Sequence, residues 1–107
     1  MIADTDIEKA LDWLRDSAKQ IGAAKADTIR CSHLLKHTKA LMMKQFNDLP
    51  VAAQQREAEA SDAFRKALEA DAIAAGEYET LKSLREAAAM RIEAWRSASA
   101  NYRAMKL

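Results

Sequence analysis

Two histidines and a single cysteine are the side chains of this sequence with the widest chemical range. His33 and His37 are four residues apart, so both rings lie on one face of a helix, a spacing that metal sites use. A metal site needs three or four ligands, however, and Cys31 lies about 200° around a helix from His33. We therefore expect no metal and no cofactor, and we expect Cys31 to be a small core residue.

His33 also begins a short pattern with Leu35 and Lys36. The pattern resembles that of HPt domains, helical bundles in which an exposed histidine accepts a phosphoryl group and is followed by an apolar residue, a lysine and a glycine. The resemblance implies phosphotransfer through His33. The sequence departs from the pattern at His37, which stands in place of the glycine and would crowd a docking receiver domain. The residues by themselves predict two surface histidines on a basic helix face.

The carboxylates do not form a catalytic constellation. Many have a basic residue one helical turn away, as Asp12 has Arg15 and Asp62 has Arg65. This spacing is typical of an ion-paired, solvated helix surface. An enzyme needs a concave site with converging polar groups, and two long helices offer none. We therefore expect a protein that is not an enzyme.

The composition restricts the fold. The chain has 107 residues, a net charge of +1, 50% apolar residues, two glycines and one proline. So few turn residues exclude a β-sandwich and a glycine-rich phosphate loop. One cysteine excludes a disulfide scaffold within the chain. The sequence shows neither a long apolar run nor a signal peptide, so we expect a cytoplasmic protein with no membrane partner.

Apolar residues recur at helical spacing along most of the chain. A capping box at Thr5–Glu8 predicts the start of a helix that covers residues 6–46. The turn is predicted at residues 47–50, where Asn, Asp and Pro come together. A second helix is predicted over about 50–102.

Helices of these lengths, roughly 60 and 80 Å, cannot form a compact globule. We predict an all-α fold, a single domain built as a long antiparallel helical hairpin that oligomerises into a helical bundle. In this hairpin Gly22 and Gly76 lie at the same level among alanines, which predicts a close helix contact. Alternatively, the helices kink or break at these glycines and form four shorter helices. The eleven residues between Leu81 and Ile92 favour a straight helix over a left-handed supercoil.

Charge changes sign in blocks along the chain. The net charge is −2 over residues 1–24, +4 over 25–46, −5 over 47–81 and +4 over 82–107. A chain folded at the predicted turn places blocks of opposite sign beside each other. Such a pattern disfavours parallel or slipped pairings of the helices.

The C-terminal part of the second helix is predicted to extend beyond the first helix, from about Arg91 onward. It combines aromatic and basic side chains at helical spacing, which indicates a binding surface. The residues predicted to bind a partner protein or a nucleic acid are Arg91, Trp95, Arg96, Tyr102, Arg103 and Lys106. The residues predicted to form the oligomer core are Leu81, Leu84, Ala88, Ile92 and Met105.

The stretches Ile92–Arg96 and Asn101–Arg103 resemble the C-terminal ends of small helical proteins encoded by bacteriophages and prophages. The genes that encode such proteins often lie among genes of DNA metabolism. The resemblance by itself implies no activity. We expect a non-catalytic interaction or assembly protein that self-associates. One alternative is an accessory DNA- or RNA-binding protein, since aromatic rings stack on single-stranded bases, although a pI of about 7.9 is below that of dedicated binders. Another is a small inhibitor of a host enzyme.

Overall fold

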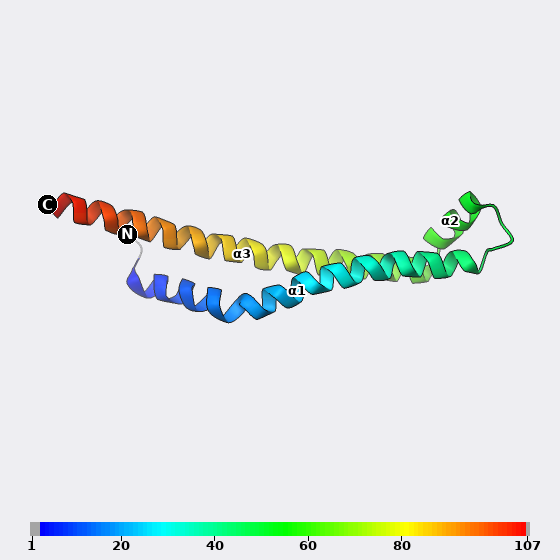
Figure 1. Ribbon diagram of the computed structural model, residues 1–107, viewed down its shortest axis with the longest axis horizontal. Coiled ribbons are helices and arrows are strands. Elements are labelled where there is room, and N and C mark those ends of the chain that lie inside the picture. Colours follow the sequence, from blue (N-terminus) through cyan, green and yellow to red (C-terminus); the bar gives the residue numbers. More distant parts are fainter. Residues whose placement is uncertain (1–2, 107) are drawn as a thin grey trace. The chain divides into compact units, whose positions relative to one another are not determined.

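The computed structural model describes residues 3–106 and consists of helices and turns (Figure 1). Helix α1 is Asp4–Lys44, α2 is Val51–Glu59 and α3 is Asp62–Lys106, and no strand occurs within residues 3–106. The contacts divide the chain into two compact units. Unit 1 joins the residues up to Gly22 with those from Glu79 onward, and unit 2 is Ala23–Tyr78.

In each unit, segments of opposite direction lie side by side. In unit 2, the Lys25 ammonium lies 5.0 Å from the ring centre of Tyr78. Lys39, which comes later in α1 than Lys25, forms an ion pair with Glu59, which comes earlier in the chain than Tyr78. In unit 1, the carboxylate of Asp4, the first residue of α1, accepts a hydrogen bond from Trp95 in the C-terminal part of α3. The predicted all-α helical hairpin is thereby confirmed.

Helix α1 begins earlier than the sequence predicts. The N–H groups of Asp6 and Ile7 donate to the carbonyl of Ala3 at 3.0 and 3.3 Å. Thr5 therefore lies within the first turn and not at the N-cap position that a capping box requires, so the predicted capping box is wrong. The carboxylate of Asp4 in this turn is favourable, because the helix dipole is positive at the N-terminus.

The turn after α1 occupies residues 45–50. The N–H of Leu49 donates to the carbonyl of Phe46 at 2.9 Å. Pro50 is the N-cap residue of α2, with φ of −57°. Its carbonyl accepts the N–H of Gln54 at 3.0 Å, and the side-chain amide of Gln54 donates back to the carbonyl of Leu49 at 2.8 Å. Because Pro50 has no N–H group, its place at the start of a helix leaves no donor unsatisfied.

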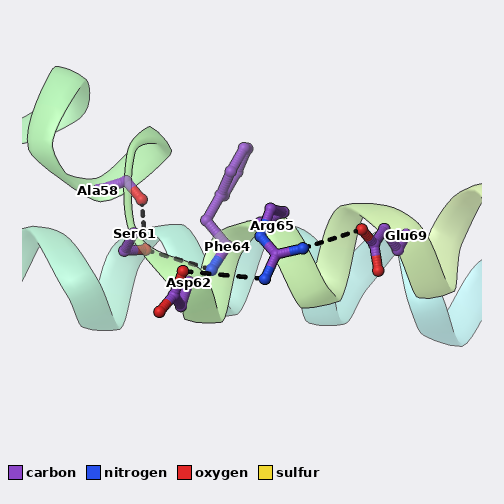
Figure 2. A network of polar contacts seen from close by, with 6 residues as sticks. All are labelled: Ala58, Ser61, Asp62, Phe64, Arg65 and Glu69. Atoms are coloured by element: carbon purple, nitrogen blue, oxygen red, sulfur yellow. Dashed lines mark hydrogen bonds and ion pairs between the residues drawn. The ribbon is translucent and has the colours of Figure 1, made fainter.

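The second predicted helix is two helices, because the chain is interrupted between Glu59 and Asp62. Figure 2 shows the cause. The hydroxyl of Ser61 accepts the N–H of Phe64 at 3.2 Å and donates to the carbonyl of Ala58 at 2.6 Å. A serine side chain that accepts this third N–H is an N-cap, so Ser61 starts α3 as a separate helix.

Most ion pairs in the described part of the chain join neighbours on one helix. The guanidinium of Arg65, for example, has one nitrogen 3.9 Å from a carboxylate oxygen of Asp62 and another 3.2 Å from a carboxylate oxygen of Glu69 (Figure 2). Between different elements, residues 3–106 form a single ion pair, in which Lys39 of α1 lies 2.9 Å from Glu59 of α2. The predicted attraction between charge blocks is thus represented by one direct ion pair in the described range and otherwise stays a prediction.

Most of the buried and half-buried residues of the long helices recur at alternating steps of three and four residues, with one step of seven between Leu81 and Ala88. This average of about 3.5 is the heptad period, and Leu81 and Ile92, eleven residues apart, are both among these residues. We call these residues the seam. In unit 1 the seam is Ile7, Ala10, Leu14, Ser17 and Ile21 of α1 with Leu81, Ala88, Ile92, Trp95 and Ser99 of α3. In unit 2 it is Ala24, Thr28, Cys31, Leu35, Thr38 and Met42 of α1 with Phe64, Ala67, Asp71, Ala74 and Tyr78 of α3.

The core that the seam forms is thin. Small residues occupy much of it, and none of the large side chains within residues 3–106 is fully buried. Ile7 is 4% exposed and Ala58, from α2, is fully buried. Many large apolar residues stay exposed, namely Leu11, Ile29, Leu34, Leu41, Val51, Leu68, Ile73, Leu84, Met90, Tyr102 and Met105.

Both glycines leave room for a Cβ atom and lie within continuous helices. A Cβ atom added at Gly22 or Gly76 would meet no heavy atom within 4 Å. The predicted close helix contact at these glycines is therefore wrong. The four-helix alternative is also wrong, because α1 continues through Gly22 and α3 continues through Gly76.

Candidate partner-binding surface

Trp95 is the residue of the predicted surface with the most specific contact. Its indole Nε1 donates a hydrogen bond to Oδ1 of Asp4 at 2.9 Å. The ring is half-buried at a seam position of unit 1. This contact corrects the prediction that α3 runs free of the first helix after Arg91, because Trp95 still lies beside the first turn of α1.

The unpaired part of α3 begins later than predicted. Ile92 and Ser99 are half-buried, whereas residues 100–106 are all exposed. Tyr102 falls at the next seam position after Ser99, but it is 51% exposed because no described residue of α1 lies beyond Asp4 to cover it. The free segment is thus shorter than predicted and keeps one seam aromatic without a helix against it.

The basic residues of this surface differ in how they are engaged. Arg96 is ion-paired with Glu93 at 3.0 Å, and the ammonium of Lys106 lies 4.7 Å from the ring centre of Tyr102. Arg91 and Arg103 form no ion pair with any residue in the range 3–106 and are exposed. These two guanidinium groups are therefore open to an external anion or carboxylate.

A hollow of about 810 Å³ lies on unit 1 where α1 begins beside α3. Its lining combines two aromatic rings with charges of both signs. The lining residues are Asp4, Glu93, Trp95, Arg96, Ser97, Ala98, Ser99, Ala100, Tyr102 and Arg103. Four of the six predicted partner-binding residues therefore line one hollow, and Arg91 and Lys106 lie outside its lining.

The residues predicted as oligomer core separate into two groups. Leu81, Ala88 and Ile92 are half-buried on the seam of unit 1, where α1 is the other helix, so part of their surface is already covered within the chain. Leu84 and Met105 are exposed. Only these two keep most of their surface for a second chain.

The candidate reactive residues belong to unit 2, whereas this surface belongs to unit 1. His33 and His37 are exposed and Cys31 is a half-buried, free thiol on the seam. Within residues 3–106 no group of three or more His, Cys, Asp or Glu side chains is arranged to hold a metal ion. Every buried side-chain polar atom in the described range has a hydrogen-bond partner, so none is left there to mark a ligand.

One charged side chain shows a shifted pKa. Asp16 accepts a hydrogen bond from Arg15 and raises the pKa of that guanidinium, with a further contribution from the charge of Asp16 and then of Asp12. Arg15 is charged at neutral pH with or without this shift, so the shift creates no proton donor or acceptor for chemistry.

Sequence reasoning missed the part of Asp4 in this surface. Asp4 is one of several acidic residues near the start of the chain, and nothing local distinguishes it as an acceptor for an indole. Its contact with Trp95 depends on how α1 and α3 are aligned. A one-residue change of alignment would move the carboxylate away from the ring, so no sequence signal could identify the pair.

The chain matches no protein-family model, no curated protein and no solved structure. The resemblance to phage proteins thus stays a prediction. None of the helices in the described range is both long enough and apolar enough to span a membrane.

Proposed function

We propose that this chain is a non-catalytic interaction protein that self-associates and binds a partner through the C-terminal part of α3. The observation that carries the proposal is the exposed apolar surface beside a thin core. Burying a large aliphatic side chain contributes about 1.5–3 kcal/mol, and the single chain leaves much of that contribution unused at Leu84 and Met105, two of the residues predicted as oligomer core. Association with another chain recovers it.

The character of the hollow on unit 1 supports a protein partner. Tryptophan, tyrosine and arginine dominate the strongest contacts in protein interfaces, and the hollow contains Trp95, Tyr102 and two arginines. The carboxylates of Asp4 and Glu93 line the same hollow and would repel a phosphate backbone. A partner with charged groups of both signs fits this lining better. We place this activity in the cytoplasm, in keeping with one free thiol.

Sedimentation equilibrium over a range of concentrations tests the proposal. We expect the mass of the wild-type chain to exceed that of a monomer and to rise with concentration. Replacing Tyr102 and Met105 together with alanine should weaken association, because both side chains are exposed in the single chain. The matched control replaces Ile73 and Met90 with alanine, because both are exposed on α3 outside its C-terminal part. The control should associate as the wild type does. A wild-type chain that stays monomeric throughout would refute self-association.

Nucleic-acid binding is the second candidate, favoured by the open guanidinium groups of Arg91 and Arg103. A fluorescent single-stranded oligonucleotide of about 20 nucleotides, titrated at several salt concentrations, separates the two functions. A nucleic-acid binder loses affinity steeply with salt, and replacing Arg91 and Arg103 with alanine lowers that dependence. We expect no binding at physiological salt. Salt-dependent binding that these replacements abolish would favour the second candidate.

A further inference from the structure

We propose that the C-terminal part of α3 in one copy of this chain binds the acidic turn of a second copy. The basic segment is defined as residues 96–106, and the acidic turn as residues 47–62. The inference rests on the proposed self-association and names the two surfaces that carry it. Both surfaces are defined by charge and by exposed apolar side chains.

The basic segment carries two arginines, one lysine and no carboxylate, a net charge of +3. Its apolar side chains are open, since Tyr102 is 51% and Met105 is 85% exposed. Arg96 is ion-paired with Glu93 outside the segment, whereas Arg103 has no ion-pair partner within the described residues, so its charge is uncompensated. The segment therefore presents apolar area and positive charge together.

The acidic turn has the opposite character. Four carboxylates and one guanidinium give it a net charge of −3. Val51, at the start of α2, is 63% exposed. Asp48 and Glu57 are exposed and form no ion pair with any residue of the range 3–106, whereas Glu59 is paired with Lys39. The turn thus offers open carboxylates beside an exposed apolar side chain.

These charges select one way for two copies to meet. Two basic segments placed together would bring +3 against +3, and two acidic turns would bring −3 against −3. Like charges brought together cost free energy, whereas opposite charges attract and guide the encounter. The basic segment of one copy therefore pairs with the acidic turn of another.

An interface made from two different surfaces is heterologous. A bound pair of copies keeps one free surface of each kind, so the assembly grows until it closes into a ring, or it stays open. The mass should therefore rise with concentration without stopping at a dimer. Because the charges are exposed, added salt should weaken the assembly.

Two charge-reversal variants of the full chain test the pairing. The first is Arg103→Glu with Lys106→Glu, which changes the basic segment from +3 to −1. The second is Asp48→Lys with Glu57→Lys, which changes the acidic turn from −3 to +1. Each variant then carries two surfaces of like sign. In an equal mixture, the unchanged acidic turn of the first variant can still bind the unchanged basic segment of the second.

We expect each variant alone to need a concentration about tenfold higher than the wild type to associate, and we expect the mixture to associate near the wild-type concentration. The control variant, Lys9→Glu with Lys19→Glu, has the same total charge as the first variant and changes exposed residues outside both surfaces; it should behave as the wild type. The mixture regains association only if both variants are folded, so the mixing experiment separates a lost surface from a lost fold.

Three results would overturn the inference. If both variants associate as the wild type does, self-association stands but these surfaces do not carry it. If the mixture associates no better than its components, the pairing of opposite surfaces is wrong. If the wild-type chain is monomeric at every concentration, the inference fails together with the proposed function.

Discussion

The indole of Trp95 and the carboxylate of Asp4 are joined by a hydrogen bond of 2.9 Å, although 91 positions separate them in the sequence. The bond links the first residue of α1 to the C-terminal part of α3. It lies one seam position before the exposed end of α3 begins, near the point where the pairing of these helices ends in unit 1. It also places an acceptor carboxylate beside an aromatic ring on the surface proposed to bind a partner.

Trp95→Phe tests the contribution of this bond. The variant keeps an aromatic ring on the seam but removes the N–H donor, so we expect the free energy of unfolding to fall by about 0.5–1 kcal/mol. Urea denaturation followed by circular dichroism measures it. The control is Trp13→Phe, since Trp13 is also half-buried in unit 1 and its indole donates to no described residue. Equal effects in the two variants would show that the bond contributes nothing.

Ser61→Ala tests the N-cap that separates α2 from α3. Loss of the hydroxyl leaves the N–H of Phe64 without this acceptor, and we expect the free energy of unfolding to fall by about 1 kcal/mol. Ser61→Asp keeps an acceptor and should retain most of the stability. Ser83→Ala, at an exposed position within α3, serves as the control and should leave stability unchanged or raise it slightly. A neutral Ser61→Ala variant would contradict the capping role.

Gly22→Ala is expected to stabilise the chain. The added methyl group enters open space, and alanine in a helix is favoured over glycine by roughly 0.5–1 kcal/mol. Thermal unfolding should therefore show a higher midpoint. Ala26→Gly, at an exposed position of the same helix, should lower it by a similar amount. A lower midpoint in Gly22→Ala would restore the close contact that the sequence predicts.

Asp71→Leu tests the polar interruption of the seam in unit 2. Asp71 is half-buried there and forms no ion pair with any residue of the described range. Leucine would add buried apolar area and remove a partly desolvated carboxylate, so we expect a gain of about 1 kcal/mol in the free energy of unfolding. The same change at Glu77, which is exposed, should stay within about 0.5 kcal/mol. A loss of stability at Asp71 would indicate that the carboxylate has a role in the fold.

A signal for the interruption at Ser61 was present in the sequence. Serine followed at once by Asp62 is typical of an N-cap with an acidic residue in the first turn. The continuous helix predicted over about 50–102 makes no use of this signal. The alanines around Gly22 and Gly76 had the opposite effect, because they indicated a close contact that the helices do not make.

The sequence by itself determined the helical class and the place of the main turn. Scarce glycine and proline, apolar residues at helical spacing and the cluster at residues 47–50 allow few other solutions. Only the tertiary structure decided which apolar residues face inward. Alanines are so frequent that apolar residues stand at neighbouring positions such as Ala10 and Leu11, or Ala74 and Ala75, yet Ala10 and Ala74 are buried while Leu11 and Ala75 are exposed. Helix pairing selects among such stripes because small residues allow two backbones to approach, and this choice also brings Asp4 to Trp95.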